Sequence, residues 1–171
     1  MSVRPASWAT DADGIGAIDT AFTTDRVYRL GREKGGFGFA LPLLTRAPLR
    51  KSYPLPDSDP GAGSFVAEAD GEIAGFAQVE PPAWNGRAAV PHLYVSAPQR
   101  GRGLGAELVD ALAGHANAAG ARCLWLETQN VNYPAVQFYL ATGFYLCGLD
   151  ESFYDPVENP GEFALFFSRP L

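Results

Sequence analysis

The N-terminal part of the chain has the spacing of an amphipathic helix. Ile15, Ile18 and Phe22 recur at intervals of three and four residues, which places them on one helical face. Thr10 precedes them and, with an acidic residue three positions later, resembles a helix N-cap. The pattern predicts a strand over residues 2–8, a helix from Thr10 onwards and a second helical segment over residues 24–34.

Residues 35–63 have a different composition, rich in glycine and proline. These residues interrupt helices and strands, so we expect no long regular element here. The segment is also too long for a plain connection, which favours either a binding loop or a mobile one.

Strand patterns follow in the middle of the chain. Residues 64–69 and 73–79 are separated by Asp70-Gly71, a typical hairpin turn. A further strand is predicted over residues 87–95, where Pro91 removes one ladder donor.

The second half of the chain alternates between strand and helix patterns. A helix is predicted over residues 103–119, with Leu104, Leu108 and Leu112 on its apolar stripe and a stop at Gly120. Asn132 resembles the N-cap of a shorter helix that ends at Gly143. Further strands are predicted over residues 122–127, 144–147 and 162–167. This order predicts an α/β or α+β sandwich with a mixed sheet.

Length and composition predict one folded domain over residues 1–171. Of the 171 residues, 47% are hydrophobic, enough to bury a sizeable core. No run of about 20 apolar residues predicts a membrane span, and the N-terminus lacks the apolar core of a signal peptide. We therefore expect a cytoplasmic protein that binds no membrane.

Cysteine, histidine and charge narrow the function classes. Cys123 and Cys147 lie in apolar runs, so we expect two reduced core side chains. Two histidines without zinc-site spacing argue against a metal centre. The net charge of -6 argues against a nucleic-acid partner and is compatible with a cationic substrate. The sequence is also compatible with a homodimer.

The glycine-rich segment Arg100-Gly101-Arg102-Gly103-Leu104-Gly105 joins a predicted strand to a predicted helix. Glycines let the backbone approach a ligand, and the first amides of a helix have no internal partners. Two arginines add charge suited to phosphate. The segment therefore predicts a pyrophosphate site.

Two other interpretations of this turn compete with that prediction. The turn can be a tight structural connection, although it has more glycine and arginine than a connection needs. It also satisfies the dinucleotide pattern G-x-G-x-x-[GA], with Glu127 where a ribose-binding acid would follow. However, residues 96–100 separate the glycines from the strand, and the turn lies past the middle of the chain. No Walker P-loop occurs.

The same turn matches the R/Q-x-x-G-x-G/A signature of the GNAT acetyltransferase superfamily. Residues 132–139 and Gly143-Phe144 are similar to its N-x-x-A-x-x-F-Y…G-F segment. The resemblance covers residues 64–148 well and implies a mixed, mostly antiparallel sheet of six to seven strands with helices on both faces. Residues 127–132 and Trp84-Asn85-Gly86 resemble, more narrowly, the streptothricin acetyltransferases, which acetylate an amine of a cationic antibiotic. Those enzymes carry an acidic pair where this chain has Pro91 and His92.

The resemblance implies how acetyl-CoA, the co-substrate, would bind. The backbone of residues 93–95 would pair with the pantetheine arm, and the turn amides would bind the pyrophosphate. Asn132 would also contact the arm. Strand packing and helix capping are compatible structural roles for the same residues. The implied cofactor-binding residues are Leu93, Tyr94, Val95, Arg100, Gly101, Arg102, Gly103, Leu104, Gly105, Asn132 and Tyr139.

The resemblance makes Tyr139 the candidate general acid, because a phenol can protonate the thiolate that leaves. A core aromatic is the structural alternative. His92 and Glu80 are the candidate general bases, since an ammonium must lose a proton before its nitrogen attacks. Glu127 is a weaker candidate, with a structural role as partner of Arg122 or of a loop amide as its alternative.

The acceptor is the least readable part of the sequence. We expect residues 35–63 to form an acceptor-side loop, and aromatic residues of loops to line the pocket, namely Phe37, Phe39, Tyr53 and Trp84. The sequence predicts an N-acetyltransferase for a small, cationic primary amine such as a streptothricin-like antibiotic or a polyamine. A protein or peptide N-acetyltransferase and a non-catalytic acyl-CoA-binding regulatory module remain open.

Overall fold

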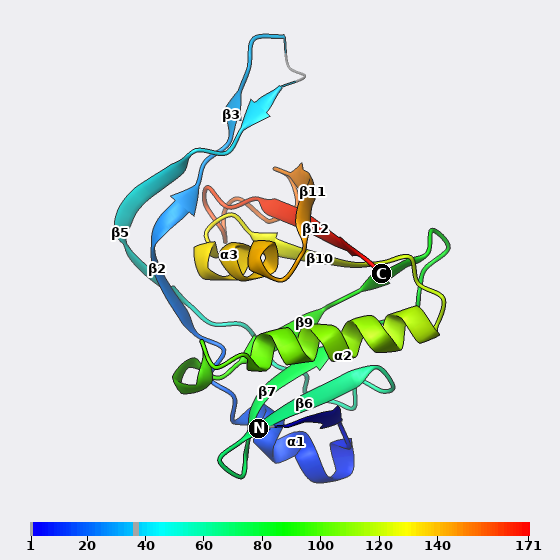
Figure 1. Ribbon diagram of the computed structural model, residues 1–171. Helices are drawn as coiled ribbons and strands as arrows, with labels where there is room; N and C mark the ends of the chain where they lie inside the picture. The colour runs from blue at the N-terminus through cyan, green and yellow to red at the C-terminus, as the bar shows by residue number, and fades with distance from the viewer. Residues whose placement is uncertain (1, 36–37) are drawn as a thin grey trace. The chain divides into compact units, whose positions relative to one another are not determined.

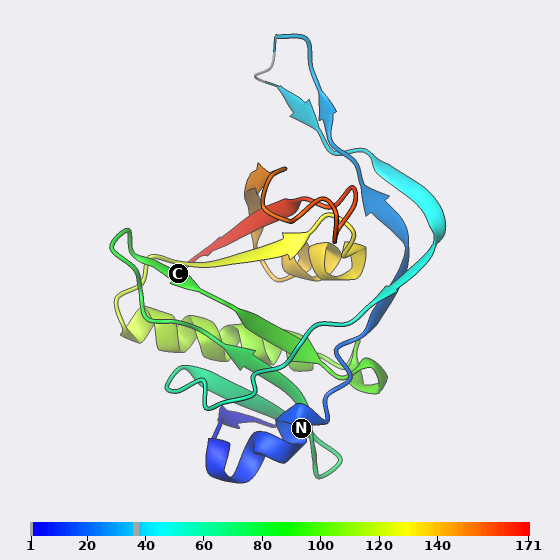
Figure 2. The ribbon, with the colours of Figure 1, turned by 180° about the vertical axis from the view of Figure 1, so that it is seen from behind.

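A computed structural model describes residues 2–35 and 38–171 (Figures 1 and 2). The chain divides into two compact units, each described by itself below. The first comprises Met1–Ala21, Ser52–Leu126 and Ser168–Leu171, and the second Phe22–Lys51 and Glu127–Phe167. The domain count given above stays a prediction. In the described part of the chain no helix combines the length and the apolar character needed to cross a membrane.

The first unit contains a four-stranded antiparallel sheet in the order β1-β6-β7-β9. Its strands are β1 (Ser2–Pro5), β6 (Ser64–Ala69), β7 (Glu72–Gln78) and β9 (His92–Val95). The predicted hairpin turn between β6 and β7 is confirmed. Asp70 and Gly71 have φ values of 56° and 86°, the left-handed pair that a type I′ turn requires.

Helices α1 (Trp8–Gly16) and α2 (Leu104–Ala118) pack on this sheet. Figure 1 shows α2 lying along strands β6, β7 and β9. Val66 and Phe76, partners across β6 and β7, are fully buried in a cluster with Ile15 of α1. The next paired position faces α2, where a side chain on Gly75 would lie 3.1 Å from Cδ1 of Leu108. Alternation along the strands therefore gives each helix its own face.

The strand predicted over residues 87–95 divides at Pro91 into the short β8 (Arg87–Ala89) and β9. β8 pairs in parallel with the first residues of β10 (Cys123–Gln129). A 3-10 turn, Ala97–Gln99, follows β9. Gly120, with φ 81°, lies just after the C-cap residue of α2, where a stop was predicted.

The second unit contains a two-stranded antiparallel ribbon of β2 (Phe22–Tyr28) and β5 (Leu43–Lys51). A second pair, β3 (Gly31–Arg32) and β4 (Phe39–Ala40), continues from it (Figure 1). The second unit also contains α3 (Tyr133–Ala141) and β11 (Tyr145–Asp150). Strand β12 (Ala164–Pro170), whose residues up to Phe167 belong to this unit, lies between β11 and β10 in the strand order.

The ribbon corrects two predictions. In place of the helix expected over residues 24–34, the structure has the end of β2 and the short β3. Thr23, Thr24 and Val27 are β-branched and favour the extended backbone of β2. Residues 35–63 contain the nine-residue strand β5 despite Pro48. The register shifts between Thr24 and Arg26, opposite Pro48, so the missing amide falls where the ladder is already interrupted.

The start of α1 is also corrected. Ser7, not Thr10, is the N-cap, and Ile18 and Phe22 lie beyond the end of the helix, although both are buried. The Asp11 carboxylate accepts the Ser7 amide at 2.8 Å and therefore fixes the earlier start. Of the two cysteines, Cys123 is a buried thiol as predicted. Cys147 is exposed, because it occupies an outward position of β11.

A buried ion pair joins β1 to α1. Arg4 donates to both carboxylate oxygens of Asp11, at 2.7 and 2.9 Å, and also to Glu68 at 2.8 Å. Asp11 is only 3% exposed. The hydrogen bonds from Arg4 lower the pKa of Asp11 from 3.8 to about 2.

We predict that Asp11→Asn lowers the free energy of unfolding at pH 7 by about 2 kcal/mol, because the charged carboxylate is paired with Arg4 only in the folded state. In the wild type this contribution is present above pH 3.8 and is lost as the pH falls through about 2. Urea unfolding at several pH values measures it. Asp13→Asn, at an exposed position of the same helix, is the control. Equal losses in both variants would contradict the assignment.

Candidate active site

Strand β9 forms an edge of the sheet in the first unit. His92, Leu93, Tyr94 and Val95 pair with Gln78, Ala77, Phe76 and Gly75 of β7. On its other side β9 has no neighbour in that sheet. Backbone donors and acceptors on that side can therefore pair with an extended ligand.

The turn after β9 collects unpaired amides. Gly101 and Gly103 have φ values of 77° and 93°, and Gly103 is the N-cap of α2. The amides of Ala106 and Glu107 donate to the Gly103 carbonyl at 2.9 and 3.2 Å. In the described part of the chain, the amides of residues 101–105 donate no hydrogen bond. Successive unpaired amides at a helix start form a site for an anion.

The two arginines of the turn have different partners. Arg100 donates from its side chain to backbone carbonyls only, those of Val95 at 2.8 Å, Ala21 at 2.7 Å and Asp19 at 3.3 Å. Arg102 lies at the surface and bonds to the side chains of Asp70, at 3.0 Å, and Gln99. Arg102 also lowers the pKa of Asp70. Arg102 is therefore the arginine side chain that an incoming phosphate can recruit.

His92 occupies a half-buried position on β9. Its ring lies 6.0 Å from that of Phe76 and 5.8 Å from that of Tyr94. Within the described residues its buried Nδ1 has no hydrogen-bond partner. Burial lowers the pKa of His92, and the charge of Glu80 partly opposes this shift. Glu80 itself is exposed, with its amide bonded to the Ala89 carbonyl. The imidazole is therefore neutral at pH 7.

Asn132 and Tyr139 belong to the second unit. Asn132 caps α3 as predicted, because its Oδ1 accepts the Ala135 amide at 3.2 Å. Tyr139 is 9% exposed, and the rings of Phe138, Phe144 and Phe167 each lie 5.7 Å from its own. These neighbours fix the orientation of the Tyr139 ring. Its role as an acid stays a prediction.

Glu127 has a partner that the sequence analysis missed. The Tyr154 hydroxyl donates to its carboxylate, whereas Arg122 bonds to the Asn85 carbonyl at 2.8 Å. The alternative role of Glu127 as a partner of Arg122 is therefore wrong. Burial raises the pKa of Glu127, and the Tyr154 bond partly opposes this. The aromatic pair Phe153-Tyr154 within the polar segment 149–161 was the available signal.

The aromatic residues expected at the acceptor pocket lie in different surroundings. Trp84 is 97% exposed and Phe39 is 51% exposed. Tyr53 stacks on Tyr94 of β9, with ring centres 6.4 Å apart and an angle of 25°. Phe37 lies outside the described residues.

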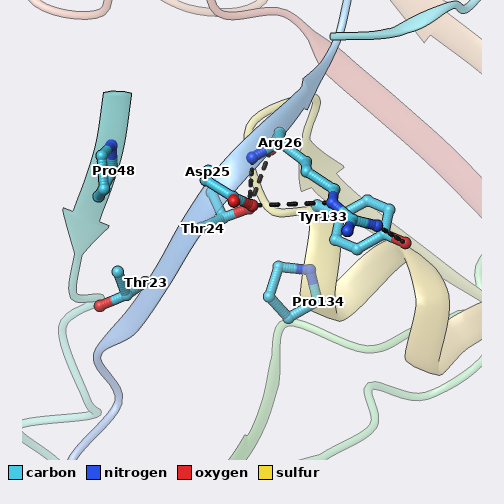
Figure 3. Close-up of a pocket in the computed structure, with 7 residues that line it drawn as sticks. All are labelled: Thr23, Thr24, Asp25, Arg26, Pro48, Tyr133 and Pro134. Carbon is cyan, nitrogen blue, oxygen red and sulfur yellow. Dashed lines mark hydrogen bonds and ion pairs between the residues drawn. The ribbon is translucent and has the colours of Figure 1, made fainter. Parts of the chain in front are cut away.

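The second unit has an open pocket of about 530 Å³, which the sequence analysis did not single out (Figure 3). The Arg26 guanidinium lies 5.4 Å from the centre of the Tyr133 ring and donates to its hydroxyl at 3.4 Å. Asp25 lies 3.7 Å from Arg26. The lining residues are Thr23, Thr24, Asp25, Arg26, Pro48, Tyr133 and Pro134.

Comparison with known proteins defines the class. Residues 34–144 match the acetyltransferase (GNAT) family. The chain therefore belongs to this family, whose members use acetyl-CoA, and it is an acyltransferase.

Particular relatives narrow the comparison. The chain is 38% identical to a streptothricin acetyltransferase of Streptomyces lavendulae, over 99% of this chain and 93% of that one. The crystal structure of a nourseothricin acetyltransferase superimposes with a TM-score of 0.87 at 40% identity, covering 99% and 97% of the two chains. A Bacillus anthracis protein, crystallised with acetyl coenzyme A, shares the fold with a TM-score of 0.85 at 23% identity, over 99% of each chain. The predicted α/β fold and family are thus confirmed.

We predict that Gly103→Ala weakens acetyl-CoA binding about tenfold, because a left-handed backbone costs an L-residue about 1–2 kcal/mol and the turn would relax away from its present geometry. Gly120→Ala is a matched control. It has φ 81° against 93°, equally open surroundings and a place at the other end of α2. Calorimetric titration should show weakened binding in Gly103→Ala alone, while both variants lose stability. Equal affinities in the two variants would remove the turn from the donor site.

Proposed function

We propose that this acetyltransferase transfers the acetyl group of acetyl-CoA to a primary amine of a small cationic acceptor, with streptothricin-class antibiotics as the first to test. One observation of the structure supports the donor half most directly, namely the unpaired amides of residues 101–105 at the start of α2. The acceptor half is supported by the 38% and 40% identity to streptothricin and nourseothricin acetyltransferases over nearly the whole chain.

In the proposed donor site, the pantetheine arm pairs with the open edge of β9 and the pyrophosphate accepts hydrogen bonds from the turn. The amides suit a pyrophosphate because they are fixed donors at the positive end of a helix dipole. The Arg102 guanidinium then leaves the Asp70 carboxylate and bonds to a phosphate oxygen. Because the Arg102–Asp70 pair is exposed, this exchange costs little.

The proposed reaction is direct transfer. The neutral amine nitrogen attacks the thioester carbonyl carbon, the C–S bond breaks, and the thiolate of CoA takes a proton from Tyr139. The acceptor ammonium gives one proton to a base before attack, and the attacking nitrogen loses a second proton to base or solvent as the amide forms. The phenolate regains a proton from solvent, so that one amide and one free thiol are formed per turnover.

We predict that Tyr139→Phe lowers kcat about a hundredfold, as expected for loss of a general acid, and leaves the Kd for acetyl-CoA within about threefold. The ring stays in its aromatic cluster, so the fold is preserved. Tyr145→Phe, at a tyrosine 52% exposed on β11, is the control. Thiol release and calorimetry measure the two quantities. An unchanged kcat in Tyr139→Phe would remove Tyr139 from the acid role.

We propose His92 as the base, with Glu80 as its electrostatic neighbour. A base works unprotonated, so kcat/KM should be lost as the pH falls through the pKa of His92. Burial places that pKa below 6.5. His92→Gln should abolish this acid limb, and Glu80→Gln should move it to lower pH. A limb that persists unchanged in His92→Gln would transfer the role to a carboxylate, Glu80 or Glu127.

An acceptor panel discriminates between the remaining functions. Streptothricin, polyamines, aminoglycosides and peptides are compared at equal concentration by thiol release. Preferential turnover of peptides would favour a protein N-acetyltransferase, and CoA binding without turnover would favour a regulatory module. The cytoplasmic location and the homodimer stay predictions.

A further inference from the structure

Arg100 holds together three segments of the first unit. Its side chain reaches the last residue of β9 through the Val95 carbonyl. It also reaches the segment that leaves α1, through the carbonyls of Ala21 and Asp19. Burial lowers the pKa of Arg100, although the guanidinium stays charged at neutral pH. Its donors are thus directed at the backbone, while its own amide starts the turn.

The segment that Arg100 holds is itself tied to the aromatic face of the sheet. Thr20, 8% exposed, donates its hydroxyl to the Tyr53 carbonyl at 2.7 Å and accepts the Tyr53 amide at 3.0 Å. Tyr53 stacks on Tyr94 of β9, and the Tyr94 ring lies 5.8 Å from His92. These contacts form a closed loop, from Arg100 through Thr20, Tyr53 and Tyr94 back along β9 to Val95.

We infer that Arg100 is a positioning residue, which couples the pyrophosphate turn to the Tyr53–Tyr94–His92 aromatic face through Thr20, rather than a phosphate ligand. This inference rests on the proposed donor site and on His92 facing the acceptor. A shift of the turn then moves the end of β9 and the Tyr53 stack together. Arg100 thereby makes the geometry at His92 depend on the geometry at the turn.

The chemistry of the side chain explains why arginine stands here. A planar guanidinium presents five N–H donors in a fixed fork, which can meet three carbonyls from two segments. Lysine keeps the charge but carries its donors on a single terminal nitrogen instead of a planar fork. A phosphate ligand tolerates this exchange better than a three-carbonyl clamp does. Arg100→Lys therefore separates the two roles.

The test compares Arg100→Lys, Thr20→Val and the double variant for Kd of CoA, and for KM and kcat of the acceptor that wild type turns over best. Thr20→Val removes the hydroxyl that holds Tyr53, keeps the volume and touches no part of the turn. We expect each single variant to lower acceptor kcat/KM about tenfold, as for the loss of buried hydrogen bonds. The acceptor kcat/KM of the double variant should be at most about threefold below that of the less active single variant, because both substitutions break the same loop.

Two further arginines supply controls. Arg102→Lys, in the same turn, changes a side chain that bonds to Asp70 and Gln99 and not to the loop through Thr20. Whatever its effect on CoA affinity, its effect on acceptor kcat/KM should add to that of Thr20→Val without coupling. Arg122→Lys replaces an arginine that bonds to the carbonyl of Asn85, away from the turn, and should leave acceptor kinetics within about twofold, the scatter expected for an independent surface site.

The outcomes separate this inference from the proposed function. Wild-type CoA binding and acetyl transfer test the function alone. If wild type does neither, the proposed function fails. The loop is then tested by a double-mutant cycle of Arg100→Lys and Thr20→Val on the free energy of unfolding in urea. Additive effects in that cycle would overturn the inference. An Arg100→Lys variant with normal acceptor kinetics and reduced CoA affinity would also overturn it and would make Arg100 a phosphate ligand.

Discussion

The amides of residues 101–105 create a requirement that the chain does not meet itself. They are fixed in one turn by two glycines in the left-handed conformation and by the start of α2. Residues 101–103 are exposed, so water satisfies these amides until a ligand replaces it. An anion with oxygen atoms on several sides satisfies them best. This requirement supports the donor site proposed above.

The rest of the first unit serves the geometry of the turn. The pairing of β9 with β7 fixes where the turn begins, and the burial of Leu104 and Leu108 against the sheet fixes the axis of α2. Gly75 lets α2 lie close to β7, because a side chain there would meet Leu108. The Arg100 side chain bonds the start of the turn to the segment that follows α1. In the proposed donor site, the positions of the backbone amides therefore depend on core packing.

The sequence was most informative where local chemistry decides the structure. Asp70-Gly71, Gly103, Gly120 and Asn132 were read correctly because turns and caps require particular residue types at particular positions. The GNAT signature identified the turn and the family for the same reason. Strand β5 was missed because its pairing with β2 spans about 20 residues and its proline falls at an irregular point of the ladder.

Side-chain partners were less predictable than backbone roles. Arginines at a glycine turn suggest phosphate, yet Arg100 is directed to carbonyls of segments up to 81 residues away in the chain. Likewise Glu127 is bonded to Tyr154, 27 residues later, and not to the nearby Arg122. Such pairings depend on which segments the fold brings together. Spacing along the sequence contains little information about them.

The most direct measurement of the central claim is an amide NMR titration of the protein with acetyl-CoA, in parallel with desulfo-CoA and a non-phosphorylated pantetheine. The account predicts that both pyrophosphate-containing ligands shift the resonances of residues 101–105 and protect these amides from hydrogen exchange, while pantetheine does not. Acetyl-CoA binding that leaves these five amides unshifted and unprotected would contradict it.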